Sequence, residues 1–312
     1  MNGKDVRRAP TVRGVYTIMP TPFDERGRLD EHSLAQLTDF LIRCGIDGLT
    51  ILGFLGEAHK LSESEQETVV KVTTATAAGR VPVYAGASAG GVSLGVQRGL
   101  RFLELGASGL LVAPVAADAP AVMAQYRALD DAMANSHPTA PVIVHDYPAA
   151  TGIRLGVDLL VRLYDDLEGV TTVKLEDPPT GPKITALRTA GSDIGVLVGL
   201  GGLYLVEELA RGADGTMTGL SFPELLLKVT RAHESGDPDA AARARTAYFD
   251  AAALLRYEFQ PGIGLAIRKE VYRRRGALAS AYVRPPGAQL DAWLAEELDH
   301  VLGHVNLKLS HG

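Results

Sequence analysis

The segment Gly169-Val-Thr-Thr-Val-Lys174, continued by Leu175-Glu-Asp-Pro-Pro-Thr180, guides the interpretation of the whole chain. Its β-branched run predicts a short buried strand that ends on a lysine, with two prolines just beyond. Because an unpaired buried ammonium is costly, Lys174 should be either paired or shifted towards its neutral amine. A neutral amine can add to a carbonyl and form a Schiff base. A lysine that faces solvent or pairs with Glu176 or Asp177 would instead be structural.

Composition and charge exclude several classes of protein. The 312 residues have a formal net charge of -6, with 46% hydrophobic and 22% charged residues, which is a globular balance. Nucleic-acid binding would need a basic face, so the run 273–275 is interpreted as a solvated helix end. The single cysteine, Cys44, excludes an intramolecular disulfide and a cysteine-based zinc site. With no apolar run of membrane-spanning length and no secretory signal, we expect a cytoplasmic protein that binds neither membrane nor nucleic acid.

Apolar strand signals recur along the chain, and each is followed by a stretch long enough for a helix. The expected strands lie near residues 14–19, 47–53, 81–86, 108–113, 141–146, 169–174, 194–199 and 213–218. Alternation of strands and helices indicates parallel strands joined by right-handed crossovers. Eight such units favour a closed barrel over an open doubly wound sheet. We therefore predict an α/β fold with a (β/α)8 TIM barrel over residues 13–235.

Helix signals frame this barrel. A helix is expected from Leu29 to Cys44, started by Asp30 or Ser33, and Ser62-Glu-Ser-Glu65 matches a capping box.

Residues 236–312 carry helix signals but no further strands. The expected helices are 237–256, a second that ends near residue 275, and a last one around Trp293. Stretches that contain proline and glycine separate them. We predict a C-terminal helical extension that packs on the barrel.

The carboxyl ends of barrel strands are where an active site is expected. The candidate catalytic residues there are Lys174, His145 and Tyr147. The turn Gly53-Phe-Leu-Gly56-Glu57 follows the second strand, and its glycines allow backbone amides to point at an anion such as a carboxylate. The same pattern also fits an ordinary tight turn.

Together these features resemble the dihydrodipicolinate synthase and N-acetylneuraminate lyase superfamily. The resemblance rests on Thr21-Pro-Phe23, the turn 53–57, Pro148 to Gly152 and Lys174, in this order, and covers about residues 13–305. It implies a Schiff base between Lys174 and pyruvate or another 2-oxo acid, with no metal and no cofactor. It also implies a homo-oligomer, dimeric or tetrameric.

The substrate-binding residues that we infer include the strand-2 turn, which would hold the carboxylate of the 2-oxo acid. The full set is Thr21, Gly53, Phe54, Leu55, Gly56, Glu57, Gly199 and Leu220. Among them, we interpret Glu57 as fixing the turn rather than transferring protons.

The chain departs from this superfamily at the positions that transfer protons. Phe54 and Leu55 occupy turn positions where members usually have hydroxyl residues, and His145 aligns with the catalytic tyrosine. Tyr147 lies two positions later, on the same face of the strand. Ala150 stands where the synthase has an arginine for its second substrate. These differences argue against synthase and sialic-acid lyase activity, and they favour a less polar 2-oxo acid, as in hydratase-aldolases.

A Schiff-base enzyme needs a proton shuttle, and His145 suits this role because the unperturbed pKa of histidine is near working pH. The alternative is that His145 is a structural histidine held by hydrogen bonds. A metal site from His145, Asp146, Glu176 and Asp177 lacks ligand spacing. The predicted function is a lyase, aldolase or hydro-lyase, that acts on a 2-oxo acid through Lys174. The alternative is an altered family member that serves as a 2-oxo acid binding or regulatory protein.

Overall fold

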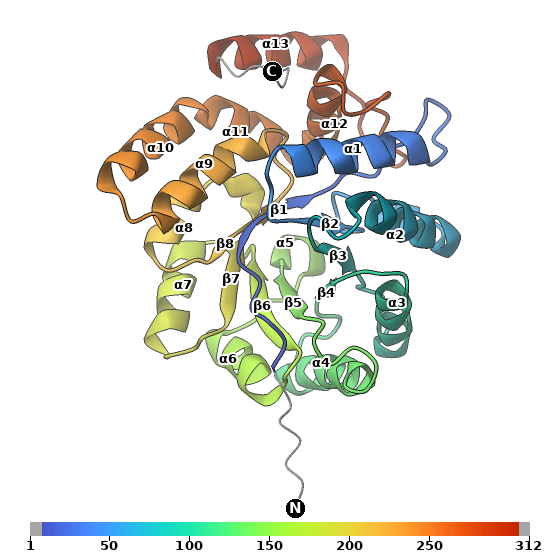
Figure 1. Ribbon diagram of the computed structural model, residues 1–312, viewed down its shortest axis with the longest axis vertical. Helices are drawn as coiled ribbons and strands as arrows, with labels where there is room; N and C mark the ends of the chain where they lie inside the picture. The colour runs from blue at the N-terminus through green and yellow to red at the C-terminus, as the bar shows by residue number, and fades with distance from the viewer. Residues whose placement is uncertain (1–7, 306–312) are drawn as a thin grey trace, which may run out of the picture.

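The computed structural model describes residues 8–305, which form a closed barrel of eight parallel strands surrounded by helices (Figure 1). The strands are β1 (Gly14–Ile18), β2 (Gly48–Ile51), β3 (Val83–Gly86), β4 (Gly109–Val112), β5 (Val142–Asp146), β6 (Val170–Leu175), β7 (Gly195–Val198) and β8 (Gly215–Thr218). β1 pairs with β8, which closes the barrel. The predicted (β/α)8 fold is confirmed, with every expected strand present.

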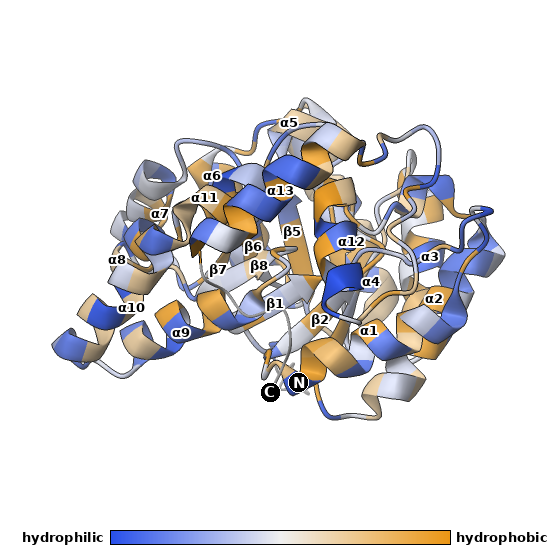
Figure 2. Cartoon of the chain, turned by 90° about the horizontal axis from the view of Figure 1, so that it is seen from above, coloured by the Kyte–Doolittle hydropathy of each residue, from blue (hydrophilic) through white to orange (hydrophobic). Residues whose placement is uncertain are grey.

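Helices connect successive strands along the outside of the barrel. They are α1 (Glu31–Arg43), α2 (Glu63–Ala77), α3 (Val92–Glu104), α4 (Ala119–Met133), α6 (Val157–Asp166), α7 (Thr180–Thr189), α8 (Leu205–Ala210) and α9 (Pro223–Glu234). Three short helices follow strand ends: η1 (Ala58–Lys60), α5 (Pro148–Thr151) and η2 (Leu200–Gly202). Hydrophobic stretches alternate with hydrophilic ones along the outer helices (Figure 2), because one side of each helix packs on the strands.

Two buried hydrophobic layers hold the barrel together. The larger layer lies between strands and helices, and it includes Leu37, Val69 and Leu160. The smaller fills the barrel interior, where the rings of Tyr16 and Tyr84 meet edge to face with centroids 5.4 Å apart. The interior is therefore a packed core, and open space is left only at the ends of the strands.

The predicted helix starts agree with the structure. Asp30 caps α1 by accepting a hydrogen bond from the Ser33 amide at 3.0 Å. Ser62 and Glu65 exchange hydrogen bonds at the start of α2, which confirms the capping box.

The C-terminal part of the described chain consists of α10 (Pro238–Asp250), α11 (Ala252–Glu258), α12 (Gly264–Arg274) and α13 (Ala292–Val305). The single helix expected over 237–256 is wrong, because the chain bends at Ala251. α10 packs on α9, whereas α11 turns towards η2 at the mouth of the barrel. The division at residue 235 stays a prediction. Within residues 8–305, no helix is long and apolar enough to cross a membrane.

Candidate active site at the mouth of the barrel

β6 delivers Lys174 and Glu176 to the mouth of the barrel. Residues two apart in a strand point to the same side, so both side chains face inward. Lys174 lies opposite His145 in the β5–β6 register. The Lys174 Nζ is 2.8 Å from the Glu176 Oε2 and 3.2 Å from the His145 Nε2. Lys174 is therefore paired, which is one of the two states expected for a buried lysine. Its amine also lies at the carboxyl ends of the strands, where an active site is expected.

Glu176 is fixed on its far side by the strand-7 loop. Its Oε1 accepts a hydrogen bond from the Leu200 amide at 2.9 Å, and its Oε2 lies 2.7 Å from the His145 Nε2. A Cβ added to Gly199 would lie 2.2 Å from the Oε1, so only glycine leaves room for this carboxylate. Gly199, a predicted substrate-binding residue, therefore leaves space for the Glu176 side chain.

The three groups influence one another's protonation. Burial raises the pKa of Glu176, but Lys174 and His145 outweigh that effect and hold it well below its usual value. Burial and the charge of Lys174 lower the pKa of His145 to about 4. At neutral pH the cluster therefore contains a carboxylate and a neutral imidazole beside the lysine. Because the Glu176 carboxylate only accepts, the His145 Nε2 carries the proton and donates to it.

A cavity of about 610 Å³ opens above this cluster. Its floor contains Lys174, Glu176 and His145. Its walls come from the strand-2 turn, the strand-5 loop and the C-terminal helices, and include Phe54, Leu55, Tyr147, Leu200, Thr218, Phe259, Leu265 and Arg268. A volume of this size accommodates a ligand considerably larger than pyruvate.

Aromatic rings form one wall of the cavity. The rings of His145 and Tyr147 stack with centroids 5.4 Å apart, and Phe54 lies 5.7 Å from His145 and 5.5 Å from Tyr147. Burial and the charge of Glu176 raise the pKa of Tyr147. Its hydroxyl has no hydrogen-bond partner within residues 8–305. Tyr147 therefore lines the cavity without joining the proton cluster.

The strand-2 turn has backbone amides to offer a ligand, since the Gly53 amide, like the next two, donates to no backbone carbonyl among residues 8–305. The Gly56 and Glu57 amides donate to carbonyls within the turn, at 3.0 and 3.1 Å. The amides of Phe54 and Leu55 donate to no backbone carbonyl in the described part of the chain. Thr21 braces the turn, since its Oγ1 donates to the Gly56 carbonyl at 2.6 Å. The arrangement suits a carboxylate at the uncommitted amides.

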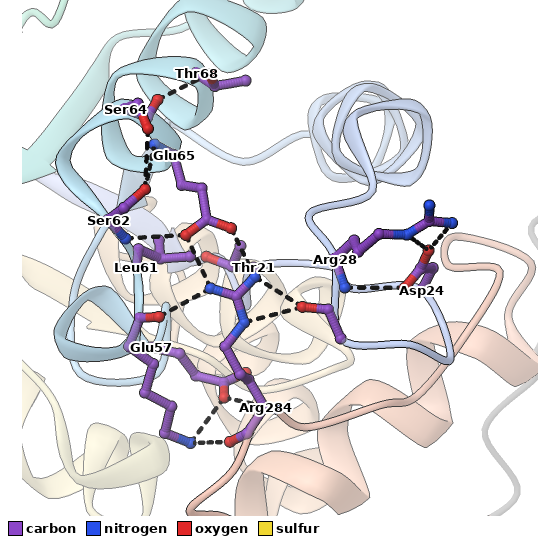
Figure 3. A network of polar contacts seen from close by, with 12 residues as sticks. Thr21, Asp24, Arg28, Glu57, Leu61, Ser62, Ser64, Glu65, Thr68 and Arg284 are labelled. Atoms are coloured by element: carbon purple, nitrogen blue, oxygen red, sulfur yellow. Dashed lines mark hydrogen bonds and ion pairs between the residues drawn. The ribbon is translucent and has the colours of Figure 1, made fainter.

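Glu57 holds the turn from behind. Its Oε1 lies 2.5 Å from the Lys269 Nζ on α12, and its Oε2 lies 2.8 Å from the Lys60 Nζ. The Arg284 amide donates to the Oε2 at 3.1 Å, while the Arg284 guanidinium pairs with Glu65 (Figure 3). These contacts tie the C-terminal segment to the turn, and the Glu57 side chain is fully buried.

The structure divides the predicted site residues into two groups. Those that line the cavity are Lys174, His145, Tyr147, Gly53, Phe54 and Leu55. Those that support it from behind are Thr21, Gly56, Glu57, Gly199 and Leu220. Leu220 is a correction to the expected substrate contacts, because its side chain is buried in the core and its carbonyl accepts a hydrogen bond from Tyr272.

Among the cavity residues that sequence reasoning did not assign to the site, Glu176 and Arg268 matter most for its charge. Glu176 was considered only as a partner for Lys174 or a metal ligand, although its position two residues after the lysine indicates the same face of the strand. Arg268 comes from α12, and no local motif marks it.

The acidic residues considered for a metal site are engaged otherwise. The Lys183 Nζ lies 2.6 Å from Asp146 and 3.1 Å from Asp177. Between residues 8 and 305, no group of three or more histidine, cysteine or acidic side chains is placed to hold a metal ion.

Comparison with known proteins agrees with this geometry. The chain matches the Dihydrodipicolinate synthetase family over residues 11–305. It is 30% identical to an L-2-keto-3-deoxyarabonate dehydratase of Azospirillum brasilense, covering 90% of both chains. It is also 30% identical to a 4-hydroxy-tetrahydrodipicolinate synthase of Rhizobium meliloti, covering 95% of this chain and 99% of that protein. The crystal structure of dihydrodipicolinate synthase from Rhodopseudomonas palustris superposes with a TM-score of 0.86 at 34% identity, covering 95% and 99% of the two chains.

Proposed function

Because the chain belongs to the dihydrodipicolinate synthetase family, whose members are lyases, we propose that it forms a Schiff base between Lys174 and a 2-oxo acid. One observation carries this proposal. A buried lysine amine opens into a large cavity, with a carboxylate at 2.8 Å and an imidazole nitrogen at 3.2 Å. A lysine that served only to balance Glu176 would not need a cavity above it.

Formation of the Schiff base begins with the loss of a proton from Lys174. Glu176, whose Oε2 lies 2.8 Å from the Nζ, can accept it, while the His145 Nε2 donates to the same oxygen. The Nζ then forms a bond to the ketone carbon, and the ketone oxygen leaves as water. Loss of the ammonium charge removes one cause of the low pKa of His145, so the imidazole becomes more basic as the reaction proceeds.

The carboxylate of the 2-oxo acid is assigned to the amides of Phe54 and Leu55. These amides lie on a turn whose Gly56 and Glu57 amides donate to the turn's own carbonyls. Backbone donors do not depend on side-chain type, so the turn can bind a carboxylate without the hydroxyl residues usual in the family.

A 4-hydroxy-2-oxo acid fits the remaining chemistry. The protonated Schiff base withdraws electrons, so a base can remove a proton from C3 while the 4-hydroxyl leaves as water, or the C3–C4 bond can break once the 4-hydroxyl is deprotonated. Similarity to a dehydratase of a 2-keto-3-deoxy sugar acid supports dehydration as the first reaction to examine. The alanine at position 150 and the displaced Tyr147 argue against the synthase reaction.

Turnover of a panel of 4-hydroxy-2-oxo acids tests the proposal. Pyruvate release measures carbon–carbon cleavage, and loss of water is followed separately by mass spectrometry. We expect at least one substrate to turn over, and Lys174→Ala to abolish the reaction. Binding of 2-oxo acids without any turnover would overturn the lyase assignment and favour a binding or regulatory protein. We also propose that the protein is a cytoplasmic homo-oligomer, either dimeric or tetrameric. Sedimentation in solution measures the oligomeric state.

A further inference from the structure

The cavity contains a second cation, Arg268, which the Schiff-base chemistry does not use. This residue of α12 is 5% exposed and lines the same cavity as Lys174. Its one ion pair in the described part of the chain is a 3.4 Å contact between the Nε and the Glu258 Oε2. The buried Nε forms no hydrogen bond among residues 8–305, because its contact with Glu258 lacks hydrogen-bond geometry.

Glu258 holds the arginine but leaves its donors free. Both carboxylate oxygens of Glu258 already accept hydrogen bonds from Ser221, one from the amide at 3.1 Å and one from the hydroxyl. The guanidinium is therefore neutralised in part, while its hydrogen-bond donors lack acceptors in the described chain. Burying a guanidinium in this state is costly unless a ligand supplies the missing acceptors.

The place of Arg268 relative to Lys174 indicates which part of a ligand it meets. Tyr147, Lys174 and Arg268 line the same cavity. A Cβ built on Gly219 would lie 2.6 Å from the Leu55 Cδ1 and 3.8 Å from the Arg268 Cδ, so the arginine side chain lies near Leu55 on the wall of the cavity. Leu55 and Leu265 line the cavity beside these groups. A 2-oxo acid attached to Lys174, with its first carboxylate at the strand-2 turn, would extend its other end towards Arg268.

We propose that Arg268 is a specificity-determining residue that binds a second, distal carboxylate, so that the preferred substrate is a 2-oxo dicarboxylic acid. This inference rests on the proposed function and names its substrate class. A guanidinium presents several donors in a planar fork that matches the two oxygens of a carboxylate. A distal hydroxyl would satisfy only one of them. The proposal departs from the expectation of a less polar 2-oxo acid, because that expectation was made without Arg268.

Borohydride trapping measures this preference without requiring turnover. Matched pairs of 2-oxo acids are compared: 2-oxoglutarate with 2-oxopentanoate, and 2-oxoadipate with 2-oxohexanoate. The fraction of protein that carries a reduced adduct is followed by intact mass over a range of ligand concentrations. We expect the dicarboxylate of at least one pair to half-saturate the wild-type protein at about 10- to 100-fold lower concentration, as for a charge-assisted hydrogen bond.

Arg268→Met should abolish this preference, and Arg268→Gln provides a second neutral variant of more polar character. Arg243→Met, on the exposed surface of α10, is the matched control and should keep the preference. Pyruvate trapping in every variant reports the Schiff base itself. If wild-type protein traps pyruvate but shows no preference in either pair, or if the preference survives both Arg268 substitutions, the inference is overturned while the proposed function stands. If pyruvate is not trapped by the wild type, the proposed function fails.

Discussion

Two buried lysines of this protein each pair with a glutamate, yet they have different surroundings. Lys269 is fully buried, with its Nζ 2.5 Å from the Glu57 Oε1, 2.8 Å from the Tyr282 carbonyl and 4.6 Å from the centre of the Phe23 ring. Lys174 has one carboxylate partner and a neutral histidine, and its remaining side faces the cavity.

From this difference we infer that access to a cavity, rather than burial alone, makes a buried lysine available as a nucleophile. Burial outweighs the nearby Glu57 and lowers the pKa of Lys269 to about 8, yet this amine is enclosed on all sides by its partners. A perturbed lysine pKa is therefore not evidence of catalysis by itself. Lys174 is distinguished by the cavity above it and by a carboxylate that can take its proton.

The Lys174 cluster, which includes Glu176, and the Lys269–Glu57 cluster should differ in what their variants change. The largest expected effect is the loss of turnover in a Glu176 variant. Glu176→Gln keeps an acceptor for the Leu200 amide but removes the carboxylate that serves Lys174. We expect turnover to fall by about 10²- to 10⁴-fold, while the Lys174 adduct still forms more slowly. Steady-state and single-turnover kinetics measure both. Unchanged turnover would show that Glu176 only balances charge.

His145→Gln should lower turnover by a similar factor, because glutamine keeps a hydrogen-bonding side chain but cannot titrate. Tyr147→Phe is the control for this pair and should have little effect on the rate, since the Tyr147 hydroxyl is not part of the proton cluster. A large loss in Tyr147→Phe with little change in His145→Gln would indicate that the tyrosine relay of the family survives in displaced form.

The second cluster should affect stability rather than chemistry. Lys269→Met leaves Glu57 buried without one of its cations, which we expect to lower the free energy of unfolding by about 3 kcal/mol. Urea denaturation measures the loss. Lys71→Met, which removes an exposed ion pair with Glu67, is the matched control and should cost less than about 1 kcal/mol. Equal losses in the two variants would mean that the Glu57 cluster does not hold the C-terminal segment to the turn.

The sequence was most informative where local patterns and the fold agree. The β-branched run before Lys174 predicted β6, and the Ser62 to Glu65 capping box predicted the start of α2. The bend at Ala251 could not be predicted, because alanine-rich local propensity continues the helix there. Tertiary contacts override this helix propensity. The Tyr248 hydroxyl donates a hydrogen bond to the Gly202 carbonyl, and α11 turns towards the mouth of the barrel.

The sequence marked Lys174 as a candidate site residue, but it did not indicate that Arg268 lines the same cavity. Lys174 stands out because a lysine at the end of an apolar strand conflicts with burial. Arg268 gives no such signal, because an arginine in a helix is ordinary. Its role depends on how α12 packs across the mouth, which is a contact between distant parts of the chain.

Reduction of the protein with borohydride in the presence of pyruvate tests the central claim most directly. Intact mass and peptide mapping locate the adduct. We predict one reduced pyruvate adduct on the peptide that contains Lys174, lost in Lys174→Ala and retained in Lys269→Met. The absence of an adduct, or an adduct that persists in Lys174→Ala, would contradict the assignment of Lys174 as the Schiff-base residue.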